Sequence, residues 1–147
     1  MKAFIYFLPI IAGLSMAVQA IVNGQLRTSV GSPYMAAFIS FATGTIVLVV
    51  LNIILNQPFG SLKTLKEIPW IQLTGGTLGV IVVTSVILAV QKMPSANMFV
   101  LLVTSQLIGA LILDHNGWLG VKQAPIDSTK LIGIILLIAG AYLVNKK

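Results

Sequence analysis

The residues best suited to chemistry in this sequence are two amides and a guanidinium at helical spacing. Gln19, Asn23 and Arg27 are spaced by four, so a helix that continues through them stacks three polar side chains on one face. Neutral amides offer both donors and acceptors, which suits a hydroxylated, amide-bearing or zwitterionic solute. The alternative for the amides is hydrogen bonding between helices, worth about 0.6 kcal/mol each. Arg27 either attracts an anion at a cavity mouth or anchors the helix at the membrane surface.

A second set of polar candidates lies in the C-terminal half. Gln106 interrupts an apolar run, where a polar side chain needs a partner or a cavity. Asp114 and His115 form the one acid–imidazole pair, and we expect it either to relay a coupling proton or to fix a loop, because Asn116-Gly117 is a turn signal. Hydroxyl groups within the apolar runs are expected to bond back to carbonyls of their own helices: Thr84, Ser85, Thr104 and Ser105.

The composition places the chain in a membrane. Of its 147 residues, 57% are hydrophobic and 8% are charged, with a mean hydropathy of +1.01, whereas soluble domains carry about 25% charged residues. The net charge of +6 comes from Lys and Arg scattered between apolar runs, as in residues that flank spans, so we expect no nucleic acid partner. With no cysteine, one histidine and three acids, we expect no metal, no cofactor and no enzyme active site.

Five apolar stretches approach or reach the 20 or so residues that cross a bilayer. They are expected at about 4–24, 33–55, 69–90, 96–113 and 131–144. The runs are continuous rather than alternating, which favours helices over barrel strands. The sequence therefore predicts an all-α membrane protein with five transmembrane helices, in which residues 1–147 form a single domain. The N-terminus also resembles a signal peptide, but apolar residues continue past Ala20, so we expect a retained helix.

Positive charges are almost evenly divided between the two sides of the membrane. With five spans the termini lie on opposite sides, and an excess of Lys and Arg normally sets the orientation. The side of the N-terminus holds five (Lys2, Lys63, Lys66, Lys122 and Lys130), and the other side holds four (Arg27, Lys92, Lys146 and Lys147). This balance predicts insertion both ways up and an antiparallel dimer, which would reproduce the inverted repeats of many transporters. The alternative is one orientation with the N-terminus inside.

Small residues recur at helical spacing within the expected spans. Gly44 follows Ser40 by four residues, and Gly75 and Gly79 are likewise four apart. Lipid gives helices no hydrophobic reason to pair, so close backbone approach at small residues must supply the contact energy. We therefore predict helix packing at Gly44, Gly75 and Gly79.

Three groups of residues together carry a resemblance to a known family. They are Gly13, Gln19, Asn23, Leu26, Gly31, Ser32, Pro33, Ala37, Ser40, Phe41 and Gly44; then Trp70, Gly75, Gly76 and Gly79; then Gln106, Asp114, His115, Gly117 and Gly120. In this pattern, which covers nearly the whole chain, the protein resembles the YdcZ-like family of small five-helix half-transporters in the drug/metabolite transporter superfamily. One departure is Ala17, where that family commonly has a proline, so the first helix is expected to be less kinked.

The resemblance implies half of a ten-helix fold in the bacterial inner membrane, paired with a second copy or a paralogous half-transporter of opposite orientation. It also implies secondary transport, as an exporter, of a small polar metabolite or drug by alternating access. From the residues we expect Gln19, Asn23, Gln106 and Arg27 to bind the solute, with Asp114 and His115 as the proton-coupling candidates. The alternatives are a small ion channel, which needs a continuous polar pore, and a non-transporting subunit of a larger complex.

Overall fold

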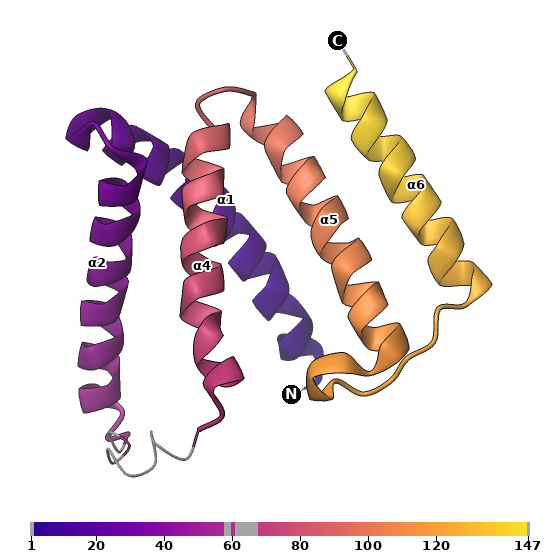
Figure 1. Ribbon diagram of the computed structural model, residues 1–147, viewed down its shortest axis with the longest axis horizontal. Helices are drawn as coiled ribbons and strands as arrows, with labels where there is room; N and C mark the ends of the chain where they lie inside the picture. The colour runs from indigo at the N-terminus through magenta and orange to yellow at the C-terminus, as the bar shows by residue number, and fades with distance from the viewer. Residues whose placement is uncertain (1, 58–59, 61–67, 147) are drawn as a thin grey trace. The chain divides into compact units, whose positions relative to one another are not determined.

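Helices account for most of the chain in the computed structural model, which describes residues 2–57, 60 and 68–146, with side chains from Ile5 onwards. The elements are α1 (Lys2–Val30), α2 (Pro33–Ile54), α4 (Trp70–Ala89), α5 (Ser95–Asn116), the 3-10 turn η1 (Trp118–Gly120) and α6 (Ser128–Asn145) (Figure 1). Within the described residues, five helices are long and apolar enough to cross a membrane, which confirms the all-α, five-span prediction. Lys63, Lys66 and Lys147, counted above, lie outside the described residues.

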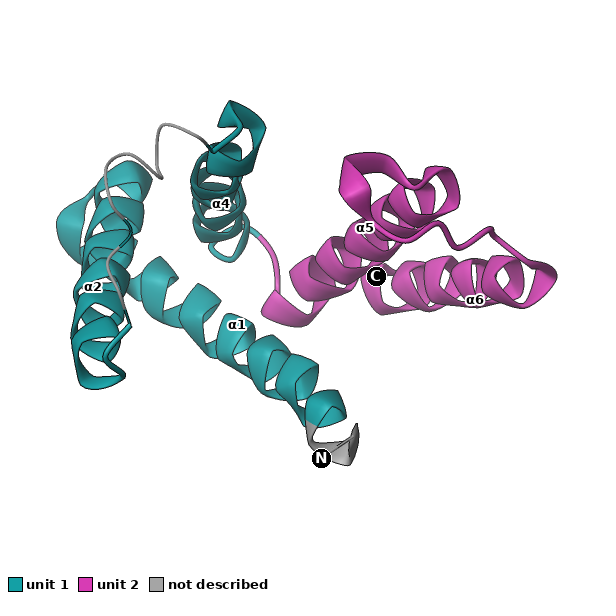
Figure 2. Cartoon of the chain, turned by 90° about the horizontal axis from the view of Figure 1, so that it is seen from below, with its two compact units in different colours: residues 1–92 teal, residues 93–147 magenta. Residues whose placement is uncertain are grey.

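The helices fall into two compact units, Met1–Lys92 and Met93–Lys147 (Figure 2). The first unit contains α1, α2 and α4, each in contact with the other two, and the second pairs α5 with α6. The single-domain interpretation of residues 1–147 stays a prediction.

The core of the first unit is built from small side chains. Ala36 and Ala37 of α2 are fully buried against Ile87 of α4, and Leu26 and Val30 of α1 pack on this cluster. Alanines let the helix backbones approach closely, which supplies the contact energy that lipid does not. Only the C-terminal half of α1 takes part, because every side chain from residue 5 to residue 15 is exposed.

Helix α1 continues to Val30, which corrects the expected end near Gly24. The last turn is kept helical because Leu26 and Val30 are held by the core. The helix ends at Gly31, whose φ of 75° is the left-handed conformation that glycine tolerates. Ser32 then caps α2 by accepting a hydrogen bond from the Met35 backbone N–H at 3.3 Å, and Pro33 occupies the first turn as predicted.

The second unit also has longer helices than the hydropathy runs indicated. α5 extends past the expected end near residue 113 to Asn116, where Gly117 terminates it with a φ of 65°. α6 starts at Ser128 rather than near residue 131, because the Asp127 carboxylate accepts from the Lys130 backbone N–H at 2.8 Å and caps the helix. Both corrections add polar residues to helices whose apolar centres were predicted correctly.

Candidate functional site

The polar stripe of α1, formed by Gln19, Asn23 and Arg27, differs in burial from one residue to the next. Gln19 is exposed and lies in a shallow hollow of about 460 Å³ on α1, together with Leu14 and Val18. One turn later Asn23 is only 5% exposed, and a further turn on Arg27 is half-buried. The structure thus places the three predicted residues on one continuous helix, since α1 does not break at Gly24.

Arg27 is the most unusual member of this stripe. Its Nη1 atom is buried and has no hydrogen-bond partner in the part of the chain that the structure describes. A buried donor left unpaired costs about 1–3 kcal/mol, and more when it is charged. Arg27 lies in the last turn of α1, where the helix dipole favours a positive charge but supplies no partner for this atom. A residue that served only as an anchor at the membrane surface would direct its guanidinium to water.

A close contact joins α1 to the two residues that follow α4, and it was not predicted from the sequence. A Cβ atom on Gly24 would lie 2.8 Å from Cγ1 of Val90, so only glycine fits there. The Gln91 side chain donates to the Gly24 carbonyl at 2.7 Å and to the Thr28 hydroxyl at 3.2 Å. The polar pair is 67 residues apart in sequence, so no local pattern signals it.

The predicted residues of α5 lie in the other compact unit. Gln106 is exposed on α5, and its role as a solute ligand stays a prediction. The neighbouring hydroxyls behave as expected, because Thr104 donates to the Val100 carbonyl at 2.7 Å and Ser105 to the Leu102 carbonyl at 2.8 Å. These two side chains therefore satisfy their hydrogen bonds within α5.

Asp114 and His115 organise the connection between α5 and α6. The Asp114 carbonyl accepts from the backbone N–H of Ala124 at 2.8 Å. His115 uses both its backbone and its ring, since its carbonyl accepts from the Gln123 side chain at 3.0 Å and its Nδ1 accepts from the Ile126 N–H at 3.1 Å. These bonds fit the loop-fixing alternative, and proton coupling by the pair stays an untested prediction.

The three glycines predicted to pack helices differ in their surroundings. Nothing lies within 4 Å of a Cβ position on Gly44 or Gly75, whereas Gly79 would meet the ring of Phe41 at 3.4 Å. Within the described residues, Gly79 is thus placed against α2. Gly44 and Gly75 face open space in the first unit. Their predicted role in helix packing therefore stays a prediction, and it would have to involve residues outside this unit.

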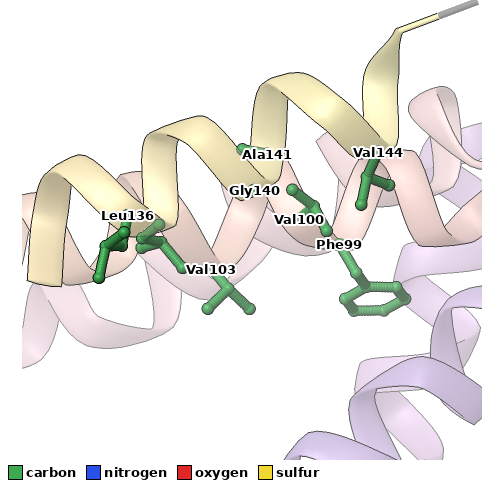
Figure 3. Close-up of a pocket in the computed structure, with 8 residues that line it drawn as sticks. Phe99, Val100, Val103, Leu136, Gly140, Ala141 and Val144 are labelled. Atoms are coloured by element: carbon green, nitrogen blue, oxygen red, sulfur yellow. The ribbon is translucent and has the colours of Figure 1, made fainter.

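The hollow between α5 and α6 has no polar side chain that could bind a polar solute. It encloses about 420 Å³ and is lined only by apolar residues, including Phe99, Val103, Leu136 and Ala141, and every side-chain atom drawn in Figure 3 is carbon. Such a surface offers neither a hydrogen bond nor a charge, so the α1 stripe remains the better candidate.

Comparison with known proteins gives two matches and one negative result. The model of a family described as "Putative inner membrane exporter, YdcZ" matches residues 4–143. The protein named Inner membrane protein YdcZ from Escherichia coli (strain K12) is 28% identical over 138 residues, which are 94% of this chain and 92% of that protein. No solved structure matches. The family match reaches from the first turn of α1 to the last turn of α6.

Proposed function

This chain belongs to the YdcZ family of inner membrane exporters, as its residue pattern predicted, and from that premise we propose that it exports a small polar solute. It is a multi-pass inner membrane protein, and five helices in the described part of the chain are long and apolar enough to span the membrane. The proposed solute carries an anionic or zwitterionic group together with hydroxyl or amide groups. The observation that supports this choice most directly is the buried, unpartnered Nη1 atom of Arg27.

The α1 stripe offers such a solute three polar side chains in succession along the helix. The exposed Gln19 amide would meet the solute first, Asn23 would supply a second amide, and the Arg27 guanidinium would pair with its anionic group. Arginine binds carboxylate and phosphate through paired, charge-assisted hydrogen bonds. The solute would thereby pair with the Nη1 donor of Arg27, which has no partner among the described residues. Gln106 of α5 stays a further candidate ligand.

We propose that the transporting unit is an antiparallel pair, formed by two copies or by this chain and a paralogous half-transporter. Two features support this proposal. The N-terminal half of α1, which leads into Gln19, has every described side chain exposed, so this half and Gln19 are open to a partner. The even division of Lys and Arg, five against four, would let the chain insert in both orientations. Alternating access would then follow from rocking one half against the other.

Solute flux tests the role of the stripe. In proteoliposomes loaded with a panel of labelled carboxylate and amino acid solutes, we expect at least one to leave with saturable kinetics and to show counterflow. Gln19→Ala should then raise the KM for that solute about tenfold, since it removes an amide from the solute path. The matched control is Gln72→Ala, which removes another exposed amide, in the first turn of α4. Non-saturable flux would indicate a channel, and an unchanged KM in Gln19→Ala would contradict the assignment.

Labelling at the C-terminus tests the antiparallel arrangement. The chain has no cysteine, so Lys146→Cys gives one unique thiol just beyond α6. In intact cells, a maleimide that cannot cross membranes should label about half of the molecules, whereas permeabilised cells should be labelled completely. Labelling of all molecules or of none in intact cells would establish one orientation and contradict the antiparallel homodimer.

A further inference from the structure

Thr84 departs from three other threonines in the helices. We expected it to bond back to its own helix, as Thr43, Thr45 and Thr104 do to carbonyls four residues earlier. Instead, its Oγ1 atom is buried and has no hydrogen-bond partner among the described residues. Burying an unpaired hydroxyl in an apolar environment is costly. A bound ligand that hydrogen-bonds to this atom would remove that cost.

Thr84 lines a cavity between α2 and α4 that is rich in aromatic side chains. The cavity has a volume of about 240 Å³, and the residues around it are Tyr34, Ala37, Phe38, Phe41, Val80 and Thr84. None of these side chains is charged, and the two with a hydroxyl group are Tyr34 and Thr84. Aromatic rings favour offset or edge-to-face contacts with another ring, so the lining suits a flat, neutral aromatic molecule better than an ion.

The cavity extends inward from one end of the two helices. Tyr34 is the second residue of α2 and Phe41 lies seven residues further on, a rise of about 10 Å along the helix. Thr84 is in the C-terminal third of α4. A phenol at a helix end is typical of the membrane interface, so a ligand could enter where amphiphilic aromatic molecules accumulate.

We propose that this cavity is a binding site for a small neutral aromatic amphiphile, such as a phenolic or indolic ring with one polar substituent. The ring would stack among Tyr34, Phe38 and Phe41, and its substituent would exchange a hydrogen bond with the Thr84 hydroxyl. The site uses none of the residues of the α1 stripe, and its existence does not depend on the proposed export of a polar solute.

A pair of probes that differ only in the polar group tests the site without any mutation. The full chain, with 13C-labelled alanine methyl groups, is titrated in detergent micelles with 2-naphthol and with 2-methylnaphthalene. The Ala37 methyl lines the cavity, so its resonance should shift saturably. We expect 2-naphthol to bind about fivefold more tightly than 2-methylnaphthalene, the factor that one neutral hydrogen bond provides.

Two controls make the result specific. Thr84→Val should abolish the preference for 2-naphthol, and Thr43→Val should retain it, because the Thr43 hydroxyl is already bonded to the Ile39 carbonyl. The Ala141 methyl lines the wholly apolar hollow of the other unit and should report no preference for 2-naphthol. Equal affinities of the two probes at Ala37, or a preference that survives Thr84→Val, would show an apolar hollow for lipid or detergent and overturn the proposal. The absence of a saturable shift at Ala37 would overturn it as well.

Discussion

Replacing Gly24 with alanine is expected to lower the free energy of unfolding by about 2 kcal/mol. The new methyl group would lie 2.8 Å from Cγ1 of Val90, the C-cap of α4, and a β-branched side chain has few rotamers with which to move away. α1 and α4 would have to separate, which would also weaken the hydrogen bond from Gln91 to the Gly24 carbonyl. The gain in helix propensity on replacing glycine, about 1 kcal/mol, offsets part of this cost. Equilibrium unfolding by sodium dodecyl sulfate in mixed micelles measures the difference.

The Gly24 prediction has a matched control and a rescue. Gly133→Ala makes the same substitution within α6, where nothing lies within 4 Å, so it should leave stability unchanged or raise it slightly. Adding Val90→Ala to Gly24→Ala removes the clashing methyl groups, and the double variant should recover most of the lost stability. Additive effects of the two substitutions would mean that Gly24 and Val90 do not contact each other.

The helices could be predicted from sequence because membrane spans are encoded locally. A continuous apolar run near 20 residues is sufficient to indicate each span, and the five runs correspond to α1, α2, α4, α5 and α6. Their ends were less predictable, because polar residues can extend a helix beyond its apolar part. Val30 is helical since the core holds it, and Ser128 is helical since Asp127 caps it.

Only the part of the candidate site that lies on a single helix could be predicted from the sequence. Gln19, Asn23 and Arg27 were visible as a stripe because their spacing of four is a local property. The burial of each stripe residue could not be predicted, because it depends on where α1 meets the other helices. The bond from Gln91 to Gly24 spans 67 residues, and the burial of the unpaired Thr84 hydroxyl depends on how α4 packs on α2. Both are tertiary features with no sequence signature.

If the unpartnered guanidinium of Arg27 is kept for solute, removing it should stabilise the protein. Arg27→Met retains most of the aliphatic stem and deletes the buried Nη1 donor. We expect the free energy of unfolding to rise by about 1–2 kcal/mol, since a buried donor without a partner is destabilising and functional residues commonly reduce stability. The same unfolding titration measures this change, and solute flux in proteoliposomes should fall at least tenfold.

The combination of higher stability and lower flux is what separates a solute ligand from a structural residue. Gln25→Met, a neighbouring exposed position on α1, controls for the general effect of adding an apolar side chain and should change flux little. Arg27→Lys should retain part of the flux, because it keeps the positive charge but loses the paired hydrogen bonds of arginine. A destabilised Arg27→Met variant would mean that the guanidinium has a structural partner in the assembled protein, for example across the proposed antiparallel interface. Arg27 would then belong to the interface between copies, and the solute path would have to rest on Gln19, Asn23 and Gln106.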